Sequence, residues 1–294
     1  MITFYNINIR LVAAQLSPVL YGWGCPFEIM TLTPNSEVSR AVEIRVSASA
    51  LSELMDKVCA DSPPNPVRIV FTENGASVWT HDMAKTVQIL ATDYPLDGLK
   101  VKEPCVLLVD PRSFSELLAT KFDGAVQITT TASEPIIIKA KGGANVVYHP
   151  ADEDDCHCVP DHWVMNNNSD GWTVFTMFDD ETATSRVTIS REELHRGIID
   201  MQVAKAPYVV FKFEHGGSSC ASGHRGSKTN RSYSAVGAKV EGEDCEVCFT
   251  ENLGMLVTKF ASDTVVLQKH SRAPFVIIES GAITMVASEA QRES

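Results

Sequence analysis

The sequence predicts an α+β protein built from two repeated domains, each with two helices on antiparallel sheets. The first observation is a repeat, because Leu118-Ala-Thr-Lys-Phe122 recurs as Leu256-Val-Thr-Lys-Phe260 at an offset of 138 residues (256 minus 118). In both copies a short break and then an apolar run follow. The second observation is that short runs of alternating apolar residues, typical of half-buried strands, surround two helical patterns in each half. Self-similarity at a fixed offset indicates a repeated structural unit.

Length and composition are compatible with this organisation. A chain of 294 residues is long enough for two domains of about 100–150 residues. The formal net charge of −12 argues against a protein whose whole surface coats nucleic acid, although it leaves room for a local basic stripe. Eight scattered cysteines indicate reduced thiols rather than a disulfide framework.

No stretch of the sequence predicts a membrane span or a signal peptide. A membrane helix needs roughly 18 or more consecutive apolar residues, and no run reaches that length. The apolar stretch from Leu11 to Leu20 is interrupted by Gln15, Ser17 and Pro18. We therefore do not expect a secreted protein.

The repeat and the composition predict the division of the chain. Residues 1–40 have no counterpart in the second half, and we expect an extension that is disordered or that lies upstream of a true start at Met30. We expect the first domain at 41–150, a connecting segment with an insertion at 151–185, the second domain at 186–290 and a tail at 291–294.

The first domain begins with a predicted strand and helix. Val42, Ile44 and Val46 alternate with charged residues, and the following helix has Ser49 as its expected N-cap. An Asn74-Gly75 pair between two apolar runs predicts a hairpin. A second helix is expected from Asp110, with Pro111 at the tolerated first position. Further strands are expected at 67–71, 77–80, 86–91, 106–109, 125–131, 135–140 and 145–149.

The second domain repeats this order. Ser190 and Glu193 form the pattern of a capping box at the start of its first helix. Thr250 is the expected cap of its second helix, so that the first helices start 141 residues apart (190 minus 49) and the second helices 140 (250 minus 110). Strands are expected at 186–189, 208–213, 219–222, 233–240, 245–249, 264–269, 275–279 and 283–287.

The predicted helix faces carry many cations for so acidic a protein. This pattern indicates a surface that meets an anionic ligand through phosphate contacts without reading sequence. The alternative is that these are ordinary solvated faces, since Glu53, Asp56, Glu116, Glu192, Glu193 and Glu251 share them. The cations on these faces that we take as candidates for such contacts are Lys57, Arg112, Lys121, Arg191, Arg196, Lys205 and Lys259.

Several stretches, in this order, resemble the DNA sliding clamp family of proliferating cell nuclear antigen (PCNA). Residues Phe249 to Ile278 resemble the family's last helix, its T-K-A turn and the strands that follow. Cys220-Ala-Ser-Gly223 resembles the family's S-A-S-G strand end, and Gly75 to Asp82 resembles the stretch before its first partner-binding loop. Asp110 to Lys121 occupies the place of another family helix. The resemblance covers roughly residues 41–290.

The resemblance implies a DNA clamp (processivity) fold and a ring. In the family, three two-domain subunits close head to tail, helices line the hole, and sheets run across the subunit boundaries. Arg196 and Lys259 match family positions that face DNA, whereas the other five cations are added from their helical positions. Glu116, Ala119 and Glu251 stand where the family usually has basic residues, so we expect a less basic inner surface.

The resemblance also implies partners. Family clamps tether DNA polymerase and other replication and repair proteins through short motifs that bind an apolar pocket, and a clamp loader places them on DNA. The matching pocket residues here are His81, Pro274, Val286 and Ala287, with Trp163 as a candidate from the connecting segment. Plain core packing is the alternative for each of them. The family's L-A-P-K ending is replaced by Val286-Ala-Ser-Glu289, and the stretch from Trp172 to Phe178 is an insertion.

Other functional readings have less support in the sequence. Cys156-His-Cys158 with His162 has the wrong spacing for a usual zinc site, and Cys245 and Cys248 fall on a predicted strand. We find no nucleotide-binding or nucleophile motif, and expect neither an enzyme nor a cofactor. We expect a homotrimeric processivity factor, in the nucleus if the organism is eukaryotic. One subunit of a heterotrimeric DNA-damage checkpoint clamp and a monomeric β-rich interaction protein are the alternatives.

Overall fold

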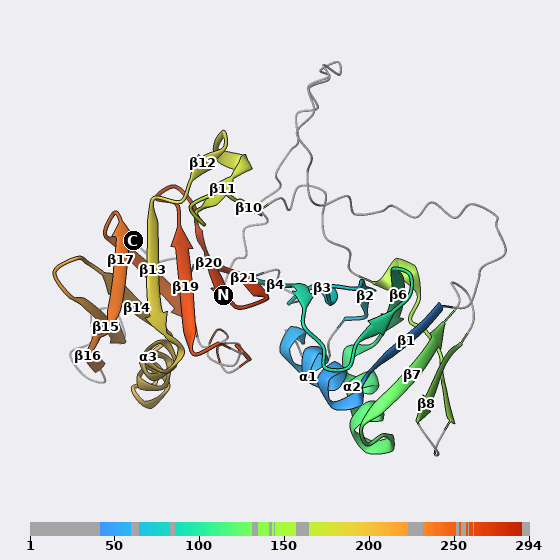
Figure 1. Cartoon of the computed structure of the whole chain (residues 1–294). Coiled ribbons are helices and arrows are strands. Elements are labelled where there is room, and N and C mark those ends of the chain that lie inside the picture. Colours follow the sequence, from blue (N-terminus) through green and yellow to red (C-terminus); the bar gives the residue numbers. More distant parts are fainter. Residues whose placement is uncertain are drawn as a thin grey trace, which may run out of the picture. The chain divides into compact units, whose positions relative to one another are not determined.

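The computed structural model confirms an α+β fold in which every strand pairing among the described residues is antiparallel (Figure 1). It describes residues 42–59, 65–82, 86–130, 135–140, 143, 145–156, 165–222, 232–250, 253, 257, 259–260 and 262–289. All of them belong to one unit of the chain, residues 39–294. The expected extension at 1–40 and the tail at 291–294 lie outside the described residues.

The described residues of the N-terminal half, within 42–150, form two helices and nine strands. Helix α1 is Ala48–Val58 and helix α2 is Pro111–Lys121. The strands are β1 (Val42–Ser47), β2 (Val67–Phe71), β3 (Ala76–His81), β4 (Val87–Tyr94), β5 (Lys100–Val101), β6 (Cys105–Val109), β7 (Ala125–Thr130), β8 (Ile136–Ala140) and β9 (Asn145–Tyr148).

The C-terminal half, residues 185–289, repeats this order. Its first helix, α3, is Arg191–Val203, and Leu253 and Val257 are the described helical residues of its second. The strands are β13 (Ser185–Ser190), β14 (Tyr208–Phe213), β15 (Ser218–Ser222), β16 (Ser232–Val236), β17 (Ala238–Gly242), β18 (Cys245–Thr250), β19 (Thr264–Lys269), β20 (Phe275–Ser280) and β21 (Ile283–Ser288).

The stretch between the halves has structure of its own. A short 3-10 helix, η1 (Glu153–Asp155), follows β9, and Glu153 forms an ion pair with Arg68 of β2 at 3.5 Å. Strands β10 (Met165–Asn167), β11 (Thr173–Phe175) and β12 (Glu181–Thr182) form a small sheet, with the 3-10 helix η2 (Thr176–Phe178) between β11 and β12. The sequence predicted only a connecting segment here, so this sheet is an addition to the expected fold.

The strand orders show that the two halves are equivalent. The five-stranded sheet of the N-terminal half has the order β5-β1-β7-β8-β9, and its counterparts in the C-terminal half have the order β17-β13-β19-β20-β21. Strands β4-β3-β2-β6 likewise match β16-β15-β14-β18. Because β21 pairs with β4, two of these four groups join into one nine-stranded sheet that spans both halves.

The helices pack on these sheets through the expected apolar faces. Leu51, Leu54, Met55 and Val58 of α1 are fully buried, as are Phe114 and Leu118 of α2. Small polar residues allow the two helices to approach each other, since the hydroxyls of Ser52 and Ser115 are hydrogen bonded at 2.7 Å. No helix among the described residues is long and apolar enough to cross a membrane.

The structure corrects three local expectations. Ser47, not Ser49, caps α1 by accepting a hydrogen bond from the Ala50 amide, so the first helices begin 143 residues apart (190 minus 47). The capping box of α3 is half formed, because the Ser190 hydroxyl accepts from the Glu193 amide while the Glu193 carboxylate binds Arg196 instead. The single strand expected at 233–240 is two strands, β16 and β17, which pair with different sheets.

Gly75 shows why the β2–β3 hairpin needs glycine. A Cβ at this position would lie 2.5 Å from the carbonyl carbon of Asp93, closer than real Cβ contacts come. The Thr72 amide donates to the Gly75 carbonyl at 2.9 Å and closes the turn. The Asn-Gly signal in the sequence therefore marked a place where two segments of backbone meet.

Candidate functional site

The cations on the helices are largely engaged in contacts with the protein itself. Arg196 binds Glu193 at 2.5 Å and the Ala235 carbonyl at 3.0 Å. Arg191 donates to the Phe260 carbonyl at 2.7 Å and to Asp263 at 3.3 Å. These bonds reduce what both guanidinium groups can offer to phosphate. Arg112, Lys121 and Lys205 lie exposed on the surface.

Two of the predicted DNA-facing lysines join the halves of the molecule. The Lys57 ammonium donates to the Lys259 carbonyl at 3.2 Å and pairs with Glu53 at 3.2 Å. The Lys259 ammonium in turn donates to the Cys59 carbonyl, at the C-terminal end of α1. Burial lowers the pKa of Lys259 from its ordinary value. Both lysines are therefore used in a structural contact between α1 and the C-terminal half.

The groove between α1 and α2 is acidic. It has a volume of about 420 Å³, and its lining includes Glu53, Asp56 and Asp123 together with the hydroxyls of Ser49 and Ser52. Carboxylates at this position repel phosphate. The helix surface of the N-terminal half is therefore poorly suited to tight DNA binding.

A row of side chains crosses the outer face of the nine-stranded sheet, the face away from the helices. Directly opposed residues of antiparallel strands point to the same face. The pairings place on one row His81, Gln88, Val286, Ile277, Gln268, Arg186 and Glu241. Two of the predicted pocket residues, His81 and Val286, are thereby brought to the same face. Ala287 has the opposite orientation and is buried in the main core, so the structure does not bring it there.

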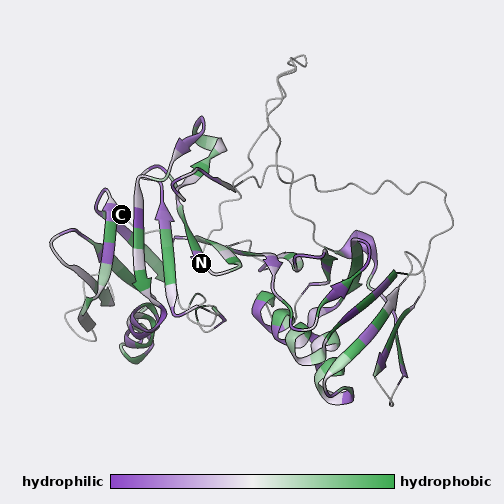
Figure 2. Cartoon of the chain, viewed as in Figure 1, coloured by the Kyte–Doolittle hydropathy of each residue, from purple (hydrophilic) through white to green (hydrophobic). Residues whose placement is uncertain are grey.

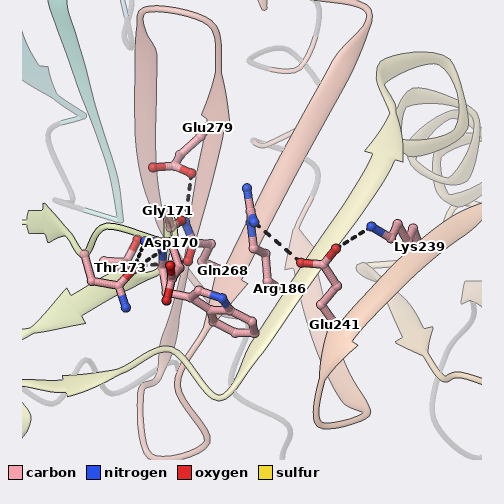
Figure 3. A network of polar contacts seen from close by, with 10 residues as sticks. Asp170, Gly171, Thr173, Arg186, Lys239, Glu241, Gln268 and Glu279 are labelled. Carbon is pink, nitrogen blue, oxygen red and sulfur yellow. Dashed lines mark hydrogen bonds and ion pairs between the residues drawn. The ribbon is translucent and has the colours of Figure 1, made fainter.

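Residues 165–182, which we call the cover segment, lie on this face beside β20 (Figure 1). Gln268 is fully buried beneath the segment. Its side-chain oxygen accepts from the Thr173 amide at 2.8 Å, and its side-chain nitrogen donates to the Gly171 carbonyl at 3.1 Å and to Glu279 at 2.9 Å (Figure 3). A buried amide needs such partners, so the sheet and the segment complete each other.

Apolar contacts hold the middle of the cover segment. Phe175 is 4 % exposed and forms a second hydrophobic cluster with Ala183 and with Ala273, Ile277 and Val286 of the sheet side. Further along the row, Trp172 packs against Gly242, where an added Cβ would lie 3.0 Å from the indole ring. The predicted pocket residue Val286 is therefore already covered by the chain's own segment.

A polar clasp holds the end of the cover segment. The Glu181 carboxylate accepts from His270 at 2.9 Å and from Arg272 at 2.5 Å. The hydrogen bond from His270, with further contributions from Arg272, lowers the pKa of Glu181 below its ordinary value. The Phe178 ring stacks on His270 at 4.6 Å, and the Arg272 guanidinium lies 5.0 Å from the same ring. No motif in the sequence indicates this clasp, because Glu181 lies about 90 residues from His270 and Arg272.

The other predicted pocket residues have different positions. Pro274 is exposed just before β20, and the backbone carbonyl of Pro274 accepts from the Glu289 amide. His81 is nearly buried, with its ring nitrogen 2.7 Å from the Asp82 carbonyl and its ring 5.1 Å from Trp79. Trp163 lies outside the described residues.

Strands β9 and β16 each end a sheet of the described residues and have one edge unpaired there. β9 pairs with β8 and β16 with β15, and neither has a second partner within the described part of the chain. Their counterparts β21 and β4 pair with each other inside the molecule. An unpaired edge presents free backbone donors and acceptors for another strand.

Exposed apolar residues gather near these two edges. Ile137 and Val147, which oppose each other on β8 and β9, are 36 % and 59 % exposed. Ile199 and Val203 on α3 are 41 % and 78 % exposed, and Figure 2 shows hydrophobic and hydrophilic residues sharing that helix. α3 lies beside β16, because the Ser234 hydroxyl donates to Asp200 at 2.9 Å. The described residues include one further large exposed apolar side chain, Met177.

The cysteines show no metal or redox arrangement among the residues described. No group of three or more potential ligands is found there. Burial raises the pKa of Cys248 to about 11 and also raises that of Cys245, so neither is a ready thiolate. Cys158 and both histidines of the other candidate cluster, His157 and His162, lie outside the described residues.

Comparison of the structure with solved structures identifies the fold. It matches the DNA polymerase III beta chain of Streptococcus pneumoniae with a TM-score of 0.65 at 13% identity, over 90% of this chain and 68% of that chain. It matches the PCNA of A. fulgidus, solved with the C-terminal region of FEN-1 bound, with a TM-score of 0.64 at 10% identity, over 86% and 100% of the two chains. A PCNA2–PCNA3 complex from Sulfolobus tokodaii gives 0.61 at 12% identity, over 85% and 99%.

The sequence comparisons add no family assignment. No protein-family model matches the chain, and no curated protein matches it. The structural matches, at identities this low, show the fold: the chain has the sliding-clamp fold that the sequence resemblance predicted.

Proposed function

We propose that copies of this chain join head to tail through β9 and β16 into a ring that encircles duplex DNA. One observation carries the proposal: β21 and β4 pair inside the chain, and their equivalents β9 and β16 each have one edge without a partner among the described residues. Each copy offers one edge of each type, so every contact uses two different surfaces. Such a heterologous interface closes into a ring when the rotation between copies allows it.

The exposed apolar residues support this contact. Ile137 and Val147 flank β9, and Ile199 and Val203 lie on the helix beside β16. Large apolar side chains that remain exposed at unpaired strand edges are typical of an interface. By the resemblance to PCNA, three copies would close the ring.

The ring would hold DNA by enclosing it. Lys57 and Lys259 are used between the halves, Arg191 and Arg196 are bound to protein oxygens, and the α1–α2 groove is acidic. Arg112 and Lys205 are exposed on the surface, and we propose that they contact phosphate; Lys121, also exposed, is the counterpart of Lys259 in the repeat. Few phosphate contacts give weak, sequence-independent binding, which suits a protein that slides along DNA.

In this role the protein tethers DNA polymerase and other replication and repair proteins, and a clamp loader places it on DNA. The A. fulgidus PCNA structure, which has a bound FEN-1 segment, supports a partner surface on this fold. The ring would work where DNA is replicated, which is the nucleus if the organism is eukaryotic. We propose no enzymatic activity.

The mass of the purified protein tests the proposal. Light scattering from about 1 to 50 μM should give a stable particle of three times 32.1 kDa. Retention on a closed circular duplex and loss from the linearised form would then show that DNA is enclosed. A monomer at every concentration would contradict the homotrimer.

A second candidate function is one subunit of a heterotrimeric clamp, such as a DNA-damage checkpoint clamp. The S. tokodaii match supports it, because that structure is a complex of two different chains, PCNA2 and PCNA3. In this case β9 and β16 would meet the edges of unlike subunits. Copurification with two chains of the same fold, from a source where this chain alone is monomeric, would distinguish the two assemblies.

A further inference from the structure

The outer face of β20 and β21 is filled by an aromatic side chain from elsewhere in the chain. Phe175 of the cover segment is 4 % exposed and packs with Ala273, Ile277 and Val286. An aromatic residue seated among apolar side chains is the usual form of an anchor in a peptide complex. The cover segment therefore has the contacts of a bound peptide while belonging to the same chain.

The equivalent face of the N-terminal half has no such cover. Ile137 and Val147 occupy the positions of Ile277 and Val286, since each pair is opposed across the last two strands of its half. The exposed fractions are 36 % and 59 % for the first pair but 1 % and 8 % for the second. The fold does not require a cover at this position, so the segment is an addition specific to one half.

We propose that the cover segment is a resident competitor at the partner-docking face of the clamp. A partner peptide would have to displace it to reach Ile277 and Val286. This inference rests on the proposed clamp function for the nature of the partners, which are proteins that act on DNA. The covering of this face by Phe175, however, is observed in the structure and does not depend on the proposed function.

The contacts of the cover segment define the chemistry of a peptide that can replace it. Such a peptide is extended and supplies an aromatic side chain in place of Phe175. It presents a backbone N–H and C=O to Gln268, as Thr173 and Gly171 do. A carboxylate further along its chain would take the place of Glu181 between His270 and Arg272.

The geometry of the segment is suited to displacement. Its end is exposed from Asp179 to Thr182, and Met177 is 63 % exposed. Asp179 and Asp180 both have a positive φ, 57° and 60°, a conformation that costs free energy in residues other than glycine. Release of the segment relieves this strain and gives up the buried Phe175, the packing of Trp172 and Phe178, the bonds to Gln268 and the clasp, in which His270 is buried but Glu181 and Arg272 are exposed.

A peptide-binding experiment on the full chain tests the proposal. The probe is a fluorescent synthetic peptide with the sequence of residues 165–183 of this chain. In the native chain the tethered copy outcompetes the free peptide, because its effective concentration is high. Phe175→Ala removes the tethered anchor, so the probe should bind this variant at least about 10-fold more tightly than the native chain.

Two further variants guard against a folding artefact. Met177→Ala alters an exposed residue of the same segment and should bind the probe as weakly as the native chain does. Arg272→Ala opens the clasp at an exposed position and should strengthen probe binding, by less than Phe175→Ala does. A probe that itself carries Phe175→Ala should bind none of them measurably.

Equal probe binding to the native chain and the Phe175→Ala variant would overturn the proposal, as would absence of binding to every variant. Either result leaves the ring standing if the native chain is trimeric. A monomeric native chain that shows the expected order of probe affinities would instead overturn the homotrimer and keep the resident competitor. The two proposals can therefore fail separately.

Discussion

The last two strands of each half have the same pairing but different surroundings. In the C-terminal half, β21 pairs with β20 on one side and with β4 on the other, and the cover segment lies on the outer face. In the N-terminal half, β9 pairs with β8 alone within the described residues, and its outer face is open. Val286 is 8 % exposed and its counterpart Val147 is 59 % exposed. The burial of such a strand therefore depends on the strands and segments packed against it and not only on its own sequence.

The same difference separates β4 from β16. β4 lies between β3 and β21 in the nine-stranded sheet, whereas β16 ends the four-stranded sheet. The edges of β21 and β4 are paired with each other inside the chain. The equivalent edges of β9 and β16 have no partner strand among the described residues. We therefore expect a contact between copies to follow the geometry of the internal junction between β21 and β4.

The largest effect is expected from a charge on the β9 edge. Val147→Glu would place a carboxylate where the proposed contact removes the side chain from water, at a high desolvation cost. We expect self-association to weaken at least about 100-fold, or about 2.7 kcal/mol, so that light scattering gives 32.1 kDa instead of three times that mass. Met177→Glu, at an exposed apolar residue away from both edges, is the matched control and should keep the native mass. A trimeric Val147→Glu protein would remove β9 from the interface.

The next effect concerns the covered face. Gln268→Leu removes the side-chain amide that is hydrogen bonded to Thr173, Gly171 and Glu279. This change should lower the free energy of unfolding by about 2 kcal/mol. Urea unfolding measures it. Thr129 is the equivalent of Gln268 in the uncovered half, because it opposes Ile137 as Gln268 opposes Ile277. Thr129→Val is therefore the control, and it should lower the free energy of unfolding by less than about 0.5 kcal/mol. Equal losses of unfolding free energy in both variants would show that the bonds between Gln268 and the cover segment do not stabilise the protein.

A smaller effect on self-association is expected at Lys121, whose equivalent in the repeat, Lys259, lies at the junction between the two halves. Lys259 donates to the Cys59 carbonyl at the end of α1, and Lys121 is its counterpart in the repeated T-K-F sequence. In the ring, Lys121 of one copy would meet the C-terminal turn of α3 of the next, and Lys121→Ala should weaken self-association about 10-fold. Dilution-dependent mass measures it, with Lys102→Ala as an exposed control. No change would break the analogy between the internal and external junctions at this residue.

The smallest effect is a pH dependence of the cover segment. The hydrogen bond from His270 and the contacts of Arg272 lower the pKa of Glu181 in the folded chain. The clasp therefore stabilises the segment fully above the ordinary pKa of a glutamate, and this contribution is lost as the pH falls through the lowered value. Hydrogen exchange at the Thr173 amide should accelerate relative to a core amide on acidification, and Glu181→Gln should remove the pH-dependent part of that change. An unchanged profile in Glu181→Gln would assign the pH dependence to another group.

Local patterns predicted most elements because strands and helices here have one apolar face. The positions of Val42, Ile44 and Val46 alone indicate a strand, and those of Leu51, Met55 and Val58 indicate a helix. The boundary between them was harder, because Ser47 and Ser49 are equally suited to cap a helix. Their hydroxyls lie 2.8 Å apart, and the point at which β1 leaves the sheet decides that Ser47 is the cap.

The candidate site was predictable only in part. The resemblance to the clamp family identified His81 and Val286, which the structure places on one row of the sheet. It did not predict that Phe175 covers Val286, because that contact depends on residues more than 100 positions apart. The basic helix faces were visible in the sequence, but their bonds to Glu193, Asp263 and backbone carbonyls were not.

The sequence by itself determined the repeat, the fold class and most of the order of strands and helices, because each depends on the spacing of apolar residues along the chain. Tertiary structure alone decided which equivalent strands are joined and which remain free, and which outer face is covered. Backbone pairing and burial depend on neighbours brought from distant parts of the chain. Two equivalent strand pairs, β20–β21 and β8–β9, therefore have different surroundings in one molecule.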